Sequence, residues 1–181
     1  MNEIIEPLVS EEEITKRINE IALEIMSDFS DDEITLICVL KGGVFFMVDL
    51  ARQLKMNVHM DFMDVSSYGD STVSSGHIKI NKDLENSITG KNVLLVEDII
   101  DTGQTMVKIL THLRAQNPKI LKVCTLLDKP ARRNTEGADV DYIGFQVQDE
   151  FVVGYGLDYA QKYRNLPYIG ILKFEDDQII D

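Results

Sequence analysis

Apolar residues follow a helical spacing in some stretches of this chain and form short continuous runs in others. The first helical spacing has its apolar positions at Ile14, Ile18, Ile21, Ala22 and Ile25. Just before it, Ser10 and Glu13 stand at the spacing of a capping box, in which each side chain bonds the backbone N–H of the other residue. The pattern predicts a helix that begins after Ser10 and ends near Asp28.

Continuous apolar runs predict buried strands over residues 34–40, 58–65, 92–97, 120–127, 142–145 and 168–172, with a short returning strand over 78–80. Two further helices are predicted, one after Gly42-Gly43 and one over about 103–115 that ends before Pro118. The inner side of the first of these helices is expected to carry Val44, Met47, Val48, Ala51 and Leu54. Strands that alternate with helices predict an α/β fold with a mostly parallel central sheet flanked by helices.

The charge balance of the chain is strongly acidic. Its 181 residues include 31 acidic and 18 basic side chains, for a formal net charge of −13. A field of that sign disfavours nucleic acid and anionic membranes as partners, so we expect neither. An anionic substrate would need a positive potential created locally by its site.

Length and apolar content set further expectations. The length suits one domain, with room for a small appended lobe. No stretch approaches the ~18 apolar residues of a membrane span, and the first residues lack the pattern of a signal peptide, so we expect a cytoplasmic protein. Cys38 and Cys124 lie in apolar runs and outside any Cys-x-x-Cys pair, which predicts buried core thiols.

Residues 93–105 concentrate the candidate chemistry. Four apolar residues run into Glu97 and Asp98, where the predicted strand should end, and Asp101, Thr102, Gly103, Gln104 and Thr105 follow at the start of the next predicted helix. Ligands of open α/β sheets bind at the carboxyl ends of parallel strands, and the N–H groups of a helix amino terminus suit a phosphate. Ionised carboxylates only accept hydrogen bonds, so they suit sugar hydroxyls or a hydrated cation. The segment therefore predicts a sugar-phosphate site.

A purely structural interpretation of the same segment is also open. Asp101 or Thr102 could simply cap the helix, with Glu97 and Asp98 exposed to solvent.

Further motifs accompany this segment in the order found in one enzyme family. They are Leu40-Lys41-Gly42-Gly43, Ser66-Ser67-Tyr68-Gly69, Leu127-Asp128-Lys129-Pro130 with Arg132-Arg133, and Phe151-Val152-Val153-Gly154-Tyr155-Gly156-Leu157-Asp158-Tyr159. From about residue 10 to residue 173 the chain resembles the bacterial hypoxanthine-guanine phosphoribosyltransferases, which belong to the type I phosphoribosyltransferases.

The resemblance implies a single domain over residues 1–181 with the type I fold. Its terminal segments, the amino-terminal one and about 146–181, would form a small hood, and about 66–77 would form a mobile loop. It further implies purine salvage: Mg²⁺-dependent transfer of 5-phosphoribosyl from phosphoribosyl pyrophosphate to N9 of hypoxanthine or guanine, giving IMP or GMP and pyrophosphate. A homodimer or homotetramer is expected.

The resemblance also implies roles for individual residues. Phosphoribosyl pyrophosphate would be bound by Lys41, Gly42, Glu97, Asp98, Asp101, Thr102, Gly103, Gln104, Thr105 and Arg164. Asp101 would be the catalytic general base at purine N7, a step suited to a carboxylate. Glu97, Asp98 and Asp158 would serve the metal. The family also places a non-proline cis peptide at Leu40–Lys41.

For the purine, the resemblance implies contacts from Lys129, Phe151, Val152 and Asp158. Lys129 would donate to the 6-oxo group and would meet adenine's amino group as donor against donor, which favours 6-oxopurines. Phe151 would stack on the base, and Ser67 and Tyr68 would belong to the mobile loop. Without the resemblance, Lys129 would be assigned to the surface and Phe151 to the core.

Other functions remain open from the sequence. They are transfer to xanthine, adenine or orotate, regulatory RNA binding on the same fold, and nucleotide sensing without catalysis. Many bacterial relatives carry more glycine where this chain has Gly69-Asp70-Ser71, so the details of the loop are the least defined part of the resemblance.

Overall fold

The computed structural model describes residues 2–29, 33–67 and 78–175. Its first helix, α1 (Glu11–Asp28), begins and ends where the spacing predicts. The Ser10 hydroxyl accepts from the Glu13 N–H at 3.2 Å, and the Ser10 N–H donates to the Glu13 carboxylate at 2.8 Å. All five apolar residues predicted for its inner face are buried. The capping box and the amphipathic face are therefore confirmed.

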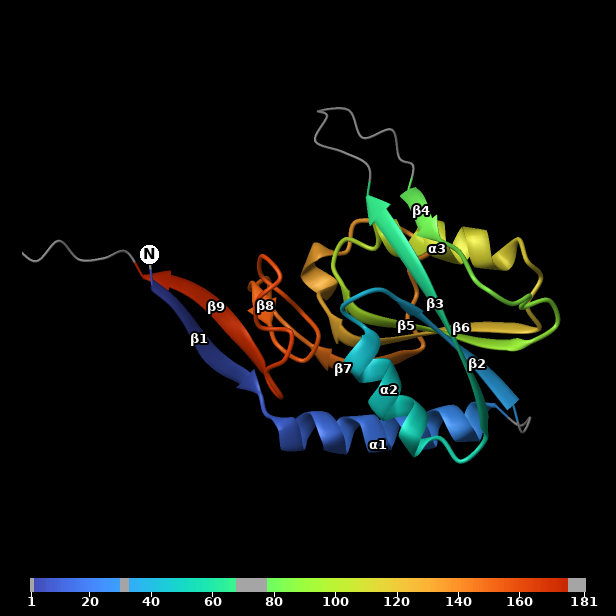
Figure 1. Ribbon diagram of the computed structural model, residues 1–181, viewed down its shortest axis with the longest axis horizontal. Helices are drawn as coiled ribbons and strands as arrows, with labels where there is room; N and C mark the ends of the chain where they lie inside the picture. The colour runs from blue at the N-terminus through green and yellow to red at the C-terminus, as the bar shows by residue number, and fades with distance from the viewer. Residues whose placement is uncertain (1, 30–32, 68–77, 176–181) are drawn as a thin grey trace, which may run out of the picture.

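Among the described residues, six strands form the central sheet in the order β4-β3-β2-β5-β6-β7. They are β2 (Glu33–Val39), β3 (Asn57–Ser67), β4 (Ile78–Lys82), β5 (Asn92–Ile100), β6 (Ile120–Asp128) and β7 (Tyr142–Gln146). All neighbours pair in parallel except β3 and β4 (Figure 1). The predicted α/β class and mostly parallel sheet are confirmed.

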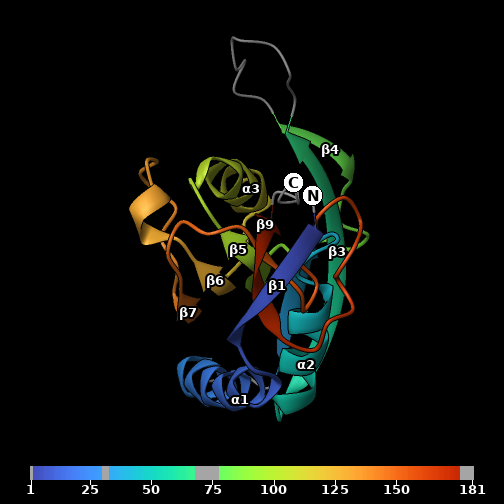
Figure 2. The same ribbon diagram turned by 90° about the vertical axis from the view of Figure 1, so that its left-hand side faces the viewer.

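The helices divide between the two faces of this sheet (Figure 2). α1 and α2 (Val44–Gln53) pack on one face, and α3 (Gln104–Arg114) packs on the other. Alternate residues of β2 serve the two cores: Leu36 and Cys38 join the α1–α2 cluster, and Ile37 and Val39 join the α3 cluster. Burial on both faces explains why the strands read as continuous apolar runs.

The predicted inner face of α2 was partly wrong. Met47 and Leu54 are buried as expected, but Phe46 and Leu50 are also buried and Val48 is 37% exposed. The helix packs against α1 as well as against β2 and β5. A helix that packs against both another helix and a sheet buries a wider part of its surface than the spacing of its own apolar residues predicts.

A second sheet brings the two ends of the described chain together. β1 (Asn2–Val9), β9 (Ile169–Glu175) and β8 (Val152–Val153) form an antiparallel sheet in the order β1-β9-β8, which we call the hood (Figure 1). Glu3 of β1 accepts hydrogen bonds from Lys162 and Tyr163, so β1 is fixed to the loop that precedes β9. The terminal segments thus meet as the resemblance implies, although no strand was predicted over 2–9, where apolar residues do not alternate.

β5 is longer than predicted, and the difference places the site. The apolar run predicts an end at Glu97, but the strand continues to Ile100 because β6 pairs with it as far as Ile100 opposite Asp128. β2 ends at Val39, and its pairing with β5 stops at Cys38 opposite Val96. Glu97 and Asp98 therefore lie within a strand whose final residues have a neighbour on one side only.

Two expectations from composition agree with the structure. Cys38 and Cys124 are buried free thiols, and burial raises the pKa of Cys38 to about 12. Within the described ranges, none of the helices is long and apolar enough to cross a membrane.

Replacing Ile21 by Ala should test the α1 core. Ile21 is fully buried, so we expect Ile21→Ala to lower the free energy of unfolding by about 2–5 kcal/mol, from lost burial and a new cavity. Leu23→Ala, two residues along and 66% exposed, is the matched control and should change it by less than about 0.5 kcal/mol. Urea titration of both variants would measure this, and equal losses would contradict the assigned helix face.

Candidate active site

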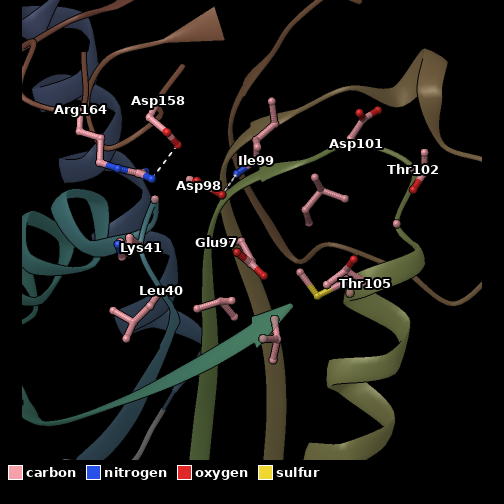
Figure 3. A pocket seen from close by; sticks show the side chains of 16 residues that line it. Leu40, Lys41, Glu97, Asp98, Ile99, Asp101, Thr102, Thr105, Asp158 and Arg164 are labelled. Carbon is pink, nitrogen blue, oxygen red and sulfur yellow. Dashed lines mark hydrogen bonds and ion pairs between the residues drawn. The ribbon is translucent and has the colours of Figure 1, made fainter. Parts of the chain in front are cut away.

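A cavity of about 380 Å³ opens at the carboxyl end of the central sheet (Figure 3). The loops after β2 and β5, the start of α3 and the segment before β9 supply its walls. Ten of the predicted site residues line it, namely Lys41, Gly42, Glu97, Asp98, Asp101, Thr102, Gly103, Thr105, Asp158 and Arg164. The structure therefore brings together most of the residues predicted for a sugar phosphate.

Glu97 and Asp98 form the acidic floor of this cavity. Burial raises the pKa of Glu97 well above its usual value, and the neighbouring charge of Asp98 raises it further. Burial also raises the pKa of Asp98. Two effects oppose it: the Ile99 N–H, which donates to the carboxylate at 2.7 Å, and the charge of Arg164 both lower that pKa. Glu97 is buried and Asp98 is half-buried, so the structural interpretation, which left both exposed to solvent, is wrong for Glu97. Their charges call for a cation or for hydroxyl donors.

The turn after β2 approaches Asp98 closely. The Leu40–Lys41 peptide bond is cis, as the resemblance implies. A Cβ atom on Gly42 would lie 1.5 Å from Asp98 Oδ2, so any larger residue would displace that carboxylate. On the other side, a Cβ on Gly156 would lie 2.0 Å from the Gly42 carbonyl oxygen. Glycine is required at both positions for this packing.

The amino terminus of α3 is left open to a ligand. Its N-cap is Gly103 at φ +85°, which has no side chain to bond the helix. The Thr102 hydroxyl accepts from the Gln104 N–H at 3.5 Å, so Thr102 provides the capping contact that the structural interpretation expected of Asp101 or Thr102. Asp101 instead accepts from Arg132 at 2.9 Å, so the interpretation of Asp101 as a cap is wrong. The first turn of a helix presents N–H groups without intrahelical partners and the positive end of the dipole. This end of the cavity suits an anion, and the Thr102 and Thr105 hydroxyls lie beside it (Figure 3).

Arg164 and Asp158 close the cavity on the hood side. Arg164 Nη2 lies 2.6 Å from Asp158 Oδ1, and Arg164 Nη1 donates to the Gly156 carbonyl at 2.7 Å. Arg164 Nε is buried without a hydrogen-bond partner. The guanidinium is therefore fixed beside Asp98 and supplies a permanent positive charge (Figure 3).

Of the four residues predicted for the purine, Asp158 lines this cavity and the other three lie beyond it. Lys129, Phe151 and Val152 do not line it, but the Lys129 N–H donates to the Ile100 carbonyl at 3.0 Å, next to Asp101. Lys129 is only 8% exposed, and its Nζ donates to the Glu150 carbonyl at 2.7 Å. Phe151 is 52% exposed and meets Tyr159 edge to face. The surface assignment of Lys129 and the core assignment of Phe151 are both wrong.

Other predicted residues have different outcomes. Gln104 is exposed at the start of α3 and does not line the cavity. Ser67 ends β3, and Tyr68 with the rest of the 68–77 loop lies outside the described residues. In the part of the chain that the structure describes, no three acidic, His or Cys side chains group closely enough to hold a metal by themselves. The predicted ligands Glu97, Asp98 and Asp158 do not form such a group.

Two basic residues near the site had no role in the sequence analysis. Arg132 bonds Asp101 and also donates to Asp149 at 3.1 Å. Arg133 bonds the buried Asp128, and its Cδ would meet a Cβ on Gly103 at 2.9 Å, so it packs beneath the start of α3. The Arg132-Arg133 pair was part of a motif shared with the family. That match singled the two residues out but did not indicate what either of them contacts.

Comparisons with known proteins give the same result as the geometry. Residues 6–160 match the model of the phosphoribosyl transferase domain. The chain belongs to this family. It is 52% identical to the hypoxanthine-guanine phosphoribosyltransferase of Bacillus subtilis, over 92% of each chain. It is 46% identical to the hypoxanthine phosphoribosyltransferase of Escherichia coli K12, over 94% of this chain and 96% of that one.

Solved structures of the family share the whole fold. A hypoxanthine-guanine phosphoribosyltransferase from Bacillus anthracis matches with a TM-score of 0.89 and 47% identity, covering 96% of this chain and 100% of that one. A hypoxanthine phosphoribosyltransferase from Staphylococcus aureus matches with a TM-score of 0.88 and 44% identity, over 93% and 91% of the two chains. The type I phosphoribosyltransferase fold expected from the motifs is confirmed.

Glu97→Gln should stabilise this phosphoribosyltransferase at alkaline pH. An acid whose folded pKa is raised loses stability as pH rises from its unfolded pKa through its folded pKa, and Gln removes that loss while keeping the shape. In buffer without divalent cations we expect Glu97→Gln to have a higher free energy of unfolding than wild type at pH 8 and nearly the same value at pH 5.

Denaturant unfolding at the two pH values would measure this gain. Glu136→Gln, an exposed acid away from the cavity, is the matched control and should change neither value. Equal stability of wild type and Glu97→Gln at pH 8 would contradict the buried carboxylate.

Proposed function

We propose that this chain is a purine-salvage phosphoribosyltransferase that transfers 5-phosphoribosyl from phosphoribosyl pyrophosphate to N9 of hypoxanthine or guanine. The products are IMP or GMP and pyrophosphate. The observation that carries the proposal is the juxtaposition at one sheet edge of a helix amino terminus with glycine as its N-cap, two adjacent carboxylates and, just beyond them, the buried Lys129. The first two suit a sugar phosphate, and the third suits a 6-oxopurine.

The sugar phosphate would lie along the cavity. Its 5′-phosphate would accept from the N–H groups and hydroxyls of Thr102–Thr105, and its ribose hydroxyls would donate to Glu97 and Asp98. Arg164 and Lys41 would face the pyrophosphate. Asp158 and the Gly156 carbonyl hold Arg164 before the ligand arrives, so its guanidinium can stabilise charge that develops on the leaving group without first reorganising.

The purine would lie between Lys129 and Phe151. Lys129 Nζ is a donor whose position is set by the Glu150 carbonyl, and the 6-oxo group of the base would be its acceptor. The exposed ring of Phe151 would stack on the base, with the Val152 backbone and Asp158 at its edge. With adenine, the Lys129 ammonium would face the amino group of the base, so that two donors would meet without an acceptor. Leaving such groups unpaired is costly.

Asp101 would act as the general base. Its carboxylate lines the cavity beside Thr102 (Figure 3), and the Ile100 carbonyl that precedes it accepts from the Lys129 N–H at 3.0 Å. It would accept the N7 proton as N9 bonds to the ribosyl carbon. A carboxylate placed there also stabilises positive charge on the ring during the transfer.

Mg²⁺ is the cofactor that the family implies, and the donor set fits it in part. Asp98 and Asp158 offer carboxylate oxygens on one side of the cavity, as Mg²⁺ prefers, and Glu97 adds a third acid nearby. Because these acids form no complete cage, substrate oxygens and water would supply the remaining ligands. When bound, the ion would offset the charge of the pyrophosphate.

The proposal extends to a cytoplasmic homodimer or homotetramer. Three large apolar side chains of α2 and β3, namely Phe45, Val48 and Met60, are 45%, 37% and 44% exposed in the single chain. Exposed apolar side chains of this size support an interface with another copy of the chain.

A substrate panel tests the proposed function. Hypoxanthine, guanine, xanthine, adenine and orotate would each be supplied with phosphoribosyl pyrophosphate and Mg²⁺, and nucleotide formation would be followed. We expect turnover with hypoxanthine or guanine and at least ~10²-fold lower efficiency with adenine, because Lys129 has no acceptor there. A preference for adenine would remove the role of Lys129, and no transfer to any base would reject the proposed reaction. RNA retained in a gel shift at physiological salt would instead favour a regulatory function.

Asp101→Asn tests the general base. We expect kcat to fall by about 10²-fold or more with little change in KM for phosphoribosyl pyrophosphate, because the amide keeps the shape but cannot accept the proton. Asp139→Asn, which removes an exposed carboxylate elsewhere, is the control and should retain wild-type kcat. Wild-type turnover by Asp101→Asn would exclude Asp101 as the base.

A further inference from the structure

A chain of alternating charges runs from the sugar-phosphate cavity to the purine side. Asp101 Oδ1 accepts from Arg132 Nε at 2.9 Å, and Arg132 Nη1 donates to Asp149 Oδ2 at 3.1 Å. The other oxygen of Asp149, Oδ1, lies 3.7 Å from Lys129 Nζ. Lys129 in turn bonds the Glu150 carbonyl, next to Phe151. The two halves of the site are thus physically connected.

The connection joins segments that are far apart in sequence. Asp101 follows β5, and Arg132 ends the short 3₁₀ helix η1 (Pro130–Arg132) after β6. Asp149 lies in the loop before β8. The Arg132 side chain bonds a carboxylate in each of the other two segments, and its hydrogen bonds to Asp101 and Asp149 raise its already high pKa. A cation at this point keeps two carboxylates close that would otherwise repel each other.

The bonding pattern at Asp101 matters for proton transfer. Arg132 engages Oδ1 alone, through its Nε. A carboxylate held by one oxygen has a defined orientation, and its second oxygen keeps its lone pairs for another donor. In Asp101 that second oxygen is Oδ2, and the donor would be purine N7–H.

We propose that Arg132 is a positioning residue that acts through Asp101. It fixes the carboxylate by Oδ1 and leaves Oδ2 to accept the N7 proton. Through Asp149 it also links this orientation to the loop before β8, next to Phe151. In the transfer, the N9 lone pair bonds the ribosyl carbon, the bond to pyrophosphate breaks with its electron pair on the pyrophosphate, and the N7 proton passes to Oδ2. Arg132 keeps its own proton throughout. The inference rests on the proposed function, in which Asp101 is the base.

The alternative is an ordinary surface ion pair. The Arg132 and Asp101 side chains are 45% and 44% exposed, and exposed pairs contribute little to folding. That alternative predicts no change in turnover when the pair is removed. The two interpretations therefore differ in kinetics and not in stability.

Arg132→Gln and Arg132→Lys test the inference. We expect Arg132→Gln to lower kcat with hypoxanthine about five- to ten-fold, while KM for phosphoribosyl pyrophosphate stays within two-fold of wild type, as suits the loss of one charged hydrogen bond at the base. Arg132→Lys keeps the charge and should recover part of the loss. Arg114→Gln, which removes an exposed charge at the end of α3, is the matched control and should retain wild-type kcat. Unchanged kcat in Arg132→Gln would overturn the proposal.

The pH profile gives a second readout that a structural role would not move. The charges around Asp101 are Arg132 from η1, Glu97 and Asp98 from β5, and, behind Arg132, Asp149 and Lys129. Because Arg132 is the cation bonded to the proposed base, the acid limb of kcat/KM for hypoxanthine should move to higher pH in Arg132→Gln. An acid limb that stays in place or moves to lower pH would contradict the proposal.

A double-mutant cycle separates failure of this inference from failure of the proposed function. If Arg132 acts through Asp101, Arg132→Gln should cause no further loss in the Asp101→Asn background. An equal loss in both backgrounds would overturn the positioning role while leaving the base in place. Wild-type turnover by Asp101→Asn alone would instead reject the proposed base, and with it the premise of the inference.

Discussion

The unequal length of two neighbouring strands is the constraint on which the rest of the site depends. β2 stops pairing at Cys38, while β5 continues for four residues beyond Val96 with β6 alone beside it. The side of β5 that β2 leaves free is occupied by the turn at Gly42, close against Asp98. Acidic residues can therefore lie in a regular strand, buried in the case of Glu97 and half-buried in the case of Asp98, and still face a cavity. The same strand carries the chain directly into the loop before α3, so the acids and the helix terminus keep a fixed separation.

Local electrostatics at this sheet edge oppose the charge of the whole molecule. A net charge of −13 repels an anionic substrate at long range, but that repulsion is screened within about 10 Å at ordinary ionic strength. Within that distance the cavity presents the open end of α3 and the fixed guanidinium of Arg164, with Arg133 packed beneath Gly103. Glu97, which is buried, and Asp98, which is half-buried, lie among these groups with the opposite charge. The site can therefore attract a phosphate and a cation to neighbouring positions.

Sequence patterns within a few residues predicted the helices and strands. Features that depend on contacts between segments distant in sequence could not be predicted in this way. The capping box and spacing of α1 gave both its ends and its buried face, since they depend on residues within a few positions of each other. The buried face of α2, the length of β5 and the burial of Lys129 each depend on a segment distant in sequence. For the site, the motifs named residues that do line one cavity, yet they gave no role to Arg132, whose partners come from two other loops.

The hood has a consequence for the order in which this protein assembles. Of the described segments, β1 leaves the ribosome first, but it pairs with β9, which leaves last, in a register that sets Asn2 opposite Glu175. β1 also holds Lys162 and Tyr163 through Glu3, in the loop that carries Asp158 and Arg164. Most of the central sheet can form from nearby segments during synthesis, whereas the hood must wait for its most distant contact. The nascent chain can therefore form the side of the cavity built by β5 and the start of α3 well before the wall that carries Asp158 and Arg164.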